Sequence, residues 1–401
     1  MALNSVEGRI KELIKRDGPI TFARFMEMAL YSEPGGYYTS LQEGEGDYYT
    51  SPTAHPVFGA LLALQLEQMW RVMGSPARFV VVEVGSGKGG LGQDILSYAE
   101  ELDSPFSDSL FYIRVEKAIP SKASDEQVIR AAGLPLHQIE GCILSNELLD
   151  AFPVHRVIQQ EGRLKEIYIG LHNEELGEVV DELSSPLIQQ QLGETGVSLS
   201  EGQQGEVNLR LRPWVEDVGE ALTKGFVITI DYGYLAQELY APERAQGTFR
   251  CYFKHTANRQ PFKRIGRQDM TAHVDFSTLI RLGEEVGLRP CGLITQREFL
   301  TNLGLHAFID ALQLRDMRQS EYYANRMGMQ SLLDPQGLGS LKVLIQQKAL
   351  EEPQLYGLSP NSPRKAELMT NKKALKVPLL SERHLQLAAA KYPHLGWDVV
   401  P

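Results

Sequence analysis

The stretch FVVVEVGSGKGG, residues 79–90, joins a short apolar run to a cluster of glycines. The run FVVVEV is rich in β-branched valine and bounded by glycine, which predicts a strand buried on both faces of a parallel sheet. The glycines allow a tight turn and the close approach of a ligand to the backbone. A helix that begins after the turn would offer its free N–H groups to an anionic group. The stretch therefore predicts a strand–turn–helix unit that binds a cofactor.

The spacing of the glycines fits two classes of cofactor. Gly85, Gly87 and Gly90 fit the GxGxxG pattern of dinucleotide-binding proteins, whereas Gly85, Gly87 and Gly89 fit the GxGxG pattern of enzymes that use S-adenosylmethionine (SAM). Glu83 favours SAM, because a carboxylate so close to the loop would repel a pyrophosphate. We expect Glu83 to orient the methionine part of SAM and the glycine loop. The alternative is a glycine-rich turn that holds no ligand.

Glu116 ends the next apolar run, LFYIRVE. A carboxylate at that strand end can accept hydrogen bonds from both ribose hydroxyls of a cofactor. Both cofactor classes would use it, so Glu116 is a predicted cofactor-binding residue that does not discriminate between them. The alternative is an ion pair with Lys117 or Arg114.

Runs of the same kind recur along the chain and are separated by helix-like stretches. They are LFYIRVE (110–116), GCILS (141–145), FVITIDYG (226–233), GLRPCGLIT (287–295) and LKVLIQQK (341–348). This alternation predicts a doubly wound, Rossmann-like α/β sheet. The predicted parts are an N-terminal helical lid (1–75), the core (76–157 and 207–350), a β-rich insertion (158–206) and a C-terminal extension of unknown role (351–401).

Composition and charge exclude several classes of protein. The 401 residues carry a net charge of −11, which argues against nucleic acid or an anionic membrane as a partner. The three cysteines lack CxxC spacing and the histidines lack HxH or HxxxH spacing, so we expect neither a metal nor a disulfide framework. No apolar run reaches membrane-spanning length, and the N-terminus reads as an amphipathic helix, which predicts a cytoplasmic protein.

Blocks of sequence on both sides of the glycine loop carry a family resemblance. They are FARFM (22–26), GYY (36–38), GDYYTSP (46–52), NELLDAFPVH (146–155), IDYG (230–233), GTFR (247–250) and DMTAHVDF (269–276). With them, the chain resembles the MidA-like SAM-dependent methyltransferases over roughly residues 18–348. Ser86 and Lys88 depart from the usual Pro and Arg of the family, and Leu148 and Leu149 replace an aromatic pair.

The resemblance implies a methyl acceptor, because the family includes a mitochondrial protein arginine methyltransferase that assists assembly of respiratory complex I. The implied substrate is an arginine of a partner protein, such as a subunit of a complex of that type. Alternatives are a small-molecule acceptor, another protein side chain, or a SAM-binding assembly factor of low activity. A wide acidic groove would favour a protein segment, and a closed apolar pocket a small molecule.

Polar residues follow two of the predicted strands. Asn146, Glu147 and Asp150 follow GCILS, and Asp231 ends another run, so all four are expected at the carboxyl edge of the sheet. We predict that Glu147 and Asp150 grip a guanidinium and take up its proton, with Asp231 or Asp269 as a third member. Alternatively, Asn146 and Glu147 contact SAM, and Asp150 caps a following helix.

The segment 47–52 is predicted to cover the cofactor. Thr50 and Ser51 are its candidates for hydrogen bonds to the methionine carboxylate of SAM. The alternative is a capping turn that opens a helix near residue 55. His255 and His273 lie in a long connection that either folds over the same edge or merely holds loop structure.

Overall fold

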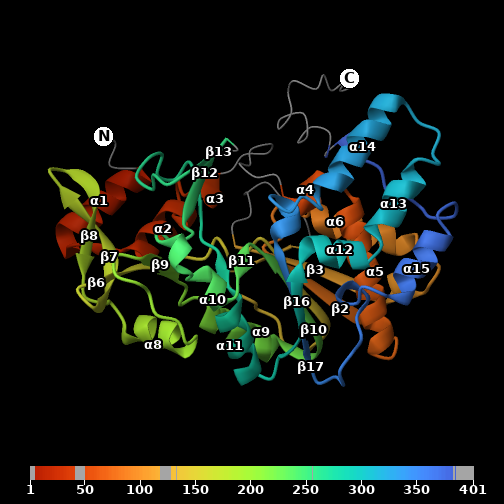
Figure 1. The fold of residues 1–401 in the computed structure, drawn as a ribbon, viewed down its shortest axis with the longest axis horizontal. Helices are drawn as coiled ribbons and strands as arrows, with labels where there is room; N and C mark the ends of the chain where they lie inside the picture. Colours follow the sequence, from red (N-terminus) through yellow and green to blue (C-terminus); the bar gives the residue numbers. More distant parts are fainter. Residues whose placement is uncertain are drawn as a thin grey trace.

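The computed structural model describes residues 5–40, 50–117, 128–131, 133–254, 256–382 and 384 of the chain. Two bodies lie side by side, as Figure 1 shows. The larger body is built on a seven-stranded sheet, and the smaller one on a five-stranded sheet beside the N-terminal helices.

The seven-stranded sheet contains the apolar runs. Its strands are β2 (Phe79–Val84), β3 (Leu110–Glu116), β4 (Val128–Arg130), β5 (Ile139–Asn146), β10 (Leu222–Asp231), β16 (Arg289–Thr295) and β17 (Lys342–Lys348). They stand in the order β16-β17-β10-β5-β2-β3-β4. Strand β17 is antiparallel to both neighbours and the other pairs are parallel, so the predicted doubly wound α/β sheet is confirmed. The chain order reverses between β5 and β2, and such sheets bind ligands in the crevice at that point.

Helices cover both faces of this sheet, because successive residues of a strand point to opposite faces. Val81 and Cys142 pack against one set of helices, and their neighbours Val82 and Ile143 pack against the other. The first set is α5 (Val57–Val72), α6 (Gly90–Glu100), α7 (Phe106–Ser109), α12 (Gln296–Asn302), α13 (Leu305–Leu312) and α14 (Gln319–Ser331). The second set is α9 (Leu211–Ala221) and α11 (Phe276–Glu285). No helix in the described part of the chain has the length and apolar character needed to cross a membrane.

The smaller body surrounds an antiparallel sheet. Its strands are β1 (Ile20–Thr21), β6 (His155–Gln160), β7 (Arg163–His172), β8 (Glu175–Asp181) and β9 (Gln204–Val207). Its helices are α1 (Val6–Asp17), α2 (Phe22–Tyr31), α3 (Tyr37–Ser40), α8 (Pro186–Glu194) and α10 (Ala236–Leu239). The region predicted as a β-rich insertion, 158–206, supplies most of this sheet. Its core joins Ile169 of β7 to Ile10, Phe25 and Met26 of the N-terminal helices.

Short strands connect the two bodies after β10. They are β11 (Gly233–Tyr234), β12 (Arg250–Phe253), β13 (Thr256–Asn258), β14 (Asp269–Thr271) and β15 (Val274–Asp275). Strands β13, β12 and β14 form an antiparallel sheet, and β11 pairs in parallel with β15. Cys251 and Met270 are buried in the core of the smaller body. This connection therefore runs from the carboxyl end of β10 onto the smaller body.

The region predicted as one N-terminal lid, residues 1–75, is divided between the two bodies. Helices α1 and α2 pack in the smaller body, whereas α5 lies in the core of the larger one. Each residue of α5 from Val57 to Trp70 is buried, and a helix that is buried all round belongs to the interior of a body. Helix α4 (Ser51–Ala54) lies directly before α5, where the chain enters the larger body.

The C-terminal segment packs along the helices of the larger body. It contains two short helices, η3 (Tyr356–Leu358) and α15 (Pro363–Thr370). Gln68 of α5 donates to the carbonyl of Gln354 at 2.8 Å, and Asn302 of α12 donates to the carbonyl of Gly357 at 2.9 Å. Four aliphatic side chains of the segment are buried in the same core: Leu355, Leu368, Leu375 and Val377.

Removal of residues 351–401 should therefore destabilise the protein severely. Burying one such side chain stabilises a fold by about 1.5–3 kcal/mol, so four of them approach the stability of a whole domain. We expect the truncated protein to be insoluble or to melt about 10 °C or more below the full chain in a thermal denaturation scan. A control that lacks only residues 385–401 keeps all of these contacts and should melt much closer to the full chain. Equal melting of the full chain and the longer truncation would contradict this role.

Candidate active site at the carboxyl edge of the large sheet

The glycine loop connects β2 to α6 in a conformation that requires glycine. Gly85, Gly87 and Gly89 have φ values of +75°, +51° and +75°, which side-chain-bearing residues rarely adopt. A Cβ on Gly85 would lie 2.8 Å from Cδ1 of Leu148, whereas a Cβ on Gly87 would meet nothing within 4 Å. The loop is therefore packed on its inner side and open at its tip.

Glu83 lies within β2 beneath this loop, and only 4% of its surface is exposed. The hydroxyl of Tyr112 donates a hydrogen bond of 3.0 Å to its Oε2. A Cβ on Gly92, in the first turn of α6, would lie 3.3 Å from the same oxygen. Burial raises the pKa of Glu83 to about 7. Glu83 thus faces the start of α6, where it can fix the position of the loop.

Glu116 ties the end of β3 to the glycine loop. Its Oε2 accepts a hydrogen bond from the N–H of Gly87 at 2.9 Å, and its Oε1 accepts one from the N–H of Lys117 at 2.8 Å. Arg114 also lies against the loop, since a Cβ on Gly89 would lie 1.7 Å from its Nη1. The carboxylate of Glu116 therefore lies beside the open tip of the loop, at the place where the sequence predicts a ribose.

Glu147 follows β5 in a strained conformation. Its φ is +51°, and its N–H donates to the carbonyl of Ile230 at 2.8 Å. Asn146 Nδ2 donates to its Oε1 at 3.2 Å, and the backbone of Ser51 also hydrogen-bonds its carboxylate. Burial and the nearby charge of Asp150 nevertheless raise the pKa of Glu147 to about 8. The side chain is half-buried. Backbone strain and a carboxylate with a strongly raised pKa are both typical of functional sites.

Asp150 and Asp231 lie next to Glu147 but have different surroundings. Asp150 is 5% exposed, and burial raises its pKa to about 7. No helix follows it, because the chain continues into β6, so its interpretation as a helix cap is wrong. The oxygens of Asp231 accept the N–H groups of Leu148, Leu149 and Tyr232 at 3.1, 2.8 and 2.9 Å. Asp231 thus holds the turn that presents Glu147 and Asp150.

Tyrosines surround these carboxylates. Tyr38 donates to both oxygens of Asp269, at 3.0 and 2.8 Å, and its ring stacks on Tyr31 at 5.3 Å. Burial and the charges of Glu147 and Asp150 raise the pKa of Tyr232, and burial and Asp150 raise that of Tyr252.

None of these four tyrosines had a role in the sequence-based site. Tyr232 directly follows Asp231, and Tyr31 and Tyr38 lie in or beside the N-terminal family blocks, so a signal existed. For Tyr31 and Tyr38, the distance along the chain from the predicted acids concealed it.

Thr50 and Ser51 begin α4. The N–H of Thr50 donates to Oγ1 of Thr53 at 2.9 Å, and the hydroxyl of Ser51 donates to Oε1 of Gln296 at 2.9 Å. The first contact fits the capping alternative, although the helix that it opens is α4 rather than one near residue 55, and the second is a tertiary contact to α12. Ser51 is fully buried, and its backbone contact to Glu147 joins α4 to the site. Residues 47–49 of this predicted cover lie outside the described part of the chain.

The ring of His273 packs against Tyr232 and Tyr234, at centroid distances of 6.2 and 5.4 Å. Burial lowers its pKa to about 4, so it is neutral at physiological pH. His255 lies outside the described residues. Among the residues that are described, no three His, Cys, Asp or Glu side chains are placed to hold a metal ion together.

Two buried polar atoms at this edge fit a ligand. Ser86 Oγ, in the glycine loop, and Asn146 Oδ1, at the end of β5, have no hydrogen-bond partner in the described part of the chain. Buried polar atoms nearly always have one, so both atoms are suited to bind a polar cofactor between the loop and β5. With Glu116 beside the loop tip, the donor set matches the hydroxyl, amine and carboxylate groups of SAM.

Comparison with known proteins agrees with this geometry. The family Methyltransf_28, described as S-adenosyl-L-methionine-dependent methyltransferases, matches residues 61–294, which is more than half of the chain. The chain belongs to this family. A COG1565 superfamily member from Burkholderia thailandensis, solved with S-adenosyl-homocysteine (SAH) bound, superposes with a TM-score of 0.77 at 26% identity. That match covers 88% of this chain and 94% of the other.

Curated relatives cover most of the chain as well. The mitochondrial protein arginine methyltransferase NDUFAF7 of Homo sapiens is 26% identical over 367 residues, 81% of this chain and 79% of the human protein. Its Drosophila melanogaster homolog is 26% identical over 379 residues, 84% of this chain and 83% of the fly protein. The predicted family, the SAM-dependent methyltransferase activity and the cofactor SAM are thereby confirmed.

Proposed function

We propose that this methyltransferase transfers the methyl group of SAM to an arginine side chain of a partner protein. The observation that carries the proposal is the pair of neighbouring carboxylates, half-buried Glu147 and buried Asp150, at the carboxyl end of β5. Buried carboxylates without a cationic partner are destabilising. An arginine guanidinium is always protonated and offers five N–H donors, so it can satisfy both groups at once. The named activity of the curated relatives supports the same acceptor.

The chemistry requires the protein to orient the acceptor and to remove one proton. Bound SAM supplies a methyl group on a positively charged sulfonium. The carboxylates hold one guanidinium nitrogen in line with that group, at about 3–3.5 Å. As the new N–CH₃ bond forms and the S–CH₃ bond breaks, the electron pair of the broken bond stays on sulfur. The nitrogen then releases its extra proton to Glu147 or Asp150, whose raised pKa values suit a base near neutral pH.

The tyrosines and Asp231 prepare this site without reacting. Asp231 fixes the turn that carries Glu147 and Asp150, as its three backbone contacts indicate. Tyr38 fixes Asp269 by donating its hydroxyl proton. Rings such as Tyr232 and Tyr252 exclude water, which strengthens the attraction between the carboxylates and a cation.

The proposal predicts a defined pH dependence of kcat/KM, which reports the free enzyme. Both carboxyl groups must be ionised, and their pKa values of about 8 and about 7 lie above the ordinary range. Activity is therefore lost as the pH falls through these values and gained as it rises. We expect kcat/KM for the acceptor, measured by transfer of the methyl group from labelled SAM, to rise about tenfold or more between about pH 6 and 8.5. A flat profile in single-turnover experiments would contradict this role of the two groups.

A direct test compares two small probes that differ in charge. N-acetyl-arginine amide carries the guanidinium, and N-acetyl-citrulline amide is its neutral counterpart of nearly equal shape. Saturation-transfer NMR on the SAH-bound protein should show binding of the arginine probe, and its loss in Glu147→Gln. Equal binding of both probes would contradict a cation site.

A cytoplasmic location also remains our proposal, which imaging of the tagged protein would test.

A further inference from the structure

Residues 244–267 form a basic segment in an acidic protein, and we refer to them as the basic arm. The whole chain has a net charge of −11, yet this segment contains no aspartate or glutamate. Its basic residues are Arg244, Arg250, Lys254, Arg259, Lys263, Arg264 and Arg267. Such a concentration of one sign creates a local positive field that differs from the field of the whole molecule.

The basic arm begins beside the acceptor site. Strand β12 pairs with β14, so that Tyr252 lies opposite Asp269 and Arg250 lies opposite Thr271. Arg250 and Tyr252 are two residues apart on a strand and therefore share one face. Burial and the charge of Asp150 raise the pKa of Tyr252, and the charge of Arg250 lowers it, so charges from the acidic site and from the arm both act on this residue. Figure 1 shows β12 and β13 at the edge of the molecule, beside α3.

Lys254 aside, the basic residues of the arm form no ion pair within 4 Å in the described part of the chain, although the charge of Glu206 acts on Arg259. Arg259 donates to the carbonyl oxygens of Gln246 and Gly247, at 3.4 and 3.2 Å. Arg264 lies over the ring of Phe253 at 4.2 Å, and Arg244 lies over a tyrosine ring at 4.1 Å. Arginines elsewhere in the described chain commonly pair with acids, as in the 2.6 Å contact between Arg281 and Glu194.

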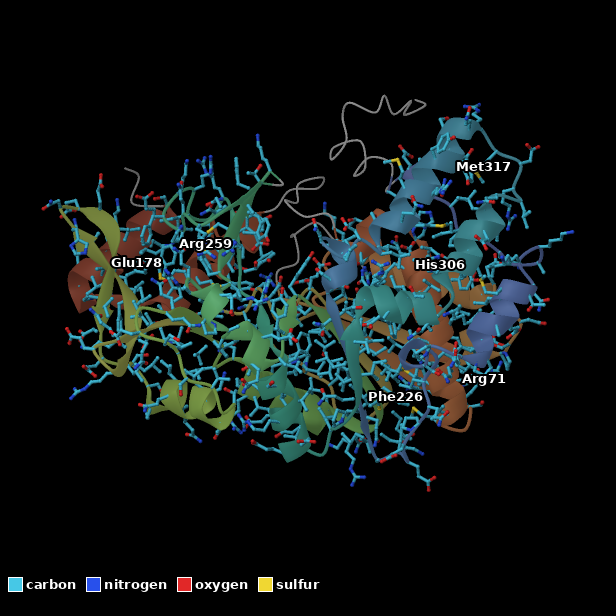
Figure 2. All side chains as sticks on the ribbon, viewed as in Figure 1. Arg71, Glu178, Phe226, Arg259, His306 and Met317 are labelled. Carbon is cyan, nitrogen blue, oxygen red and sulfur yellow. The ribbon has the colours of Figure 1, made fainter. Side chains whose placement is uncertain are left out.

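The far end of the arm is exposed. Arg259, Lys263 and Arg267 are solvent-accessible, and the first two line an open depression of about 500 Å³ together with Gln260, Pro261 and Phe262. Glu178 of β8 also lines this depression, and Figure 2 labels it near Arg259. A bound segment that leaves the acceptor site along β12 would reach this surface.

We propose that the basic arm docks an acidic segment of the partner protein, next to the cationic side chain that enters the acceptor site. The inference rests on the proposed function and adds the chemistry of the partner. Two opposite fields lie side by side: carboxylates in the site and cations along the arm. A polypeptide can supply both matching signs, including an arginine for Glu147 and Asp150, whereas a nucleic acid or an anionic lipid surface has no guanidinium. The strongly negative total charge also disfavours both of these polyanions.

Peptide binding tests the proposal independently of methyl transfer. The probe is a short fluorescein-labelled peptide with one central arginine and three glutamates on each side, and the matched probe has glutamines instead. Fluorescence anisotropy on the SAH-bound protein at low salt should give a dissociation constant about tenfold or more lower for the glutamate peptide. The difference should shrink as salt is added. Equal binding of the two peptides would overturn the proposal.

Matched variants locate the binding surface. The double variant Lys263→Glu with Arg267→Glu should weaken binding of the glutamate peptide about tenfold or more. The double variant Arg289→Glu with Lys373→Glu changes the charge equally at exposed positions outside the arm and should leave binding nearly unchanged. Equal weakening in both would show a nonspecific charge effect and overturn the proposal.

Two further probes separate this inference from the proposed function and from other polyanions. Replacing the central arginine of the peptide by citrulline tests the acceptor alone. If the citrulline peptide still binds more tightly with glutamates than with glutamines, the docking proposal holds even if arginine is not the methyl acceptor. A labelled oligo-uridine and phosphatidylserine vesicles serve as competing partners. The assignment to an acidic polypeptide would be overturned if either competitor bound more tightly than the glutamate peptide and lost that binding in the variant with Lys263→Glu and Arg267→Glu.

Discussion

Replacing Glu147 by glutamine should lower the rate of methyl transfer about a hundredfold or more, with little change in the affinity for SAM. Glutamine keeps the shape of the side chain and can still accept from the backbone of Ser51, but it has no charge to hold a guanidinium and cannot take its proton. Single-turnover transfer from tritiated SAM measures the rate, and calorimetric titration measures the affinity. Transfer at the wild-type rate by the variant would contradict the role of Glu147.

Glu140→Gln is the matched control, because Glu140 is an exposed carboxylate on the same strand, β5. It should methylate as the wild-type protein does. The thermal midpoint gives a second control for Glu147→Gln. The pKa of Glu147 is raised on folding, so its ionisation destabilises the folded state relative to the unfolded one. This loss of stability begins above the ordinary pKa of 4.5 and is complete above about pH 8. Glutamine removes that penalty, and the variant should melt no lower than the wild type at alkaline pH.

Replacing Gly85 by valine should raise the dissociation constant of SAM about a hundredfold or more. The φ of +75° is strongly unfavourable for a β-branched residue, and its Cβ would lie 2.8 Å from Cδ1 of Leu148. The loop must therefore shift, and with it the open tip at Gly87 and the contact to Glu116. Calorimetric titration with SAM and with SAH measures the loss.

Gly162→Val provides the matched control for backbone strain. Gly162 also has a positive φ, +72°, but lies in the turn between β6 and β7, where an added Cβ meets nothing within 4 Å. This variant should lose some stability and bind SAM normally. If Gly85→Val bound SAM as tightly as Gly162→Val, the glycine loop would not be the cofactor site.

The large sheet was predictable because its signals are local. Each buried parallel strand is a continuous apolar run, and the glycines at 85, 87 and 89 sit where the backbone requires a left-handed turn. The acids at 147, 150 and 231 follow strand ends, and parallel strands bring these ends to one edge. The candidate site followed from the same reasoning.

Contacts between distant segments were not predictable in this way. The division of residues 1–75 depends on which body buries each helix. The apolar pattern of a helix shows that one face is buried, but not which other element packs against that face. The hydrogen bond from Tyr38, on which Tyr31 stacks, to Asp269 joins segments more than two hundred residues apart. The hydroxyl of Ser51 meets Gln296 across a similar separation, which is why its partner differs from the expected cofactor carboxylate.

The central claim is that the two carboxylates after β5 present an arginine to SAM. The most direct measurement incubates cell extract with the protein and tritiated SAM, hydrolyses the labelled proteins to amino acids, and separates these by chromatography. The account predicts label in methylated arginine, present with the wild-type protein and absent with Glu147→Gln. Label in another amino acid or in a small molecule, or methylarginine formed equally by the variant, would contradict it.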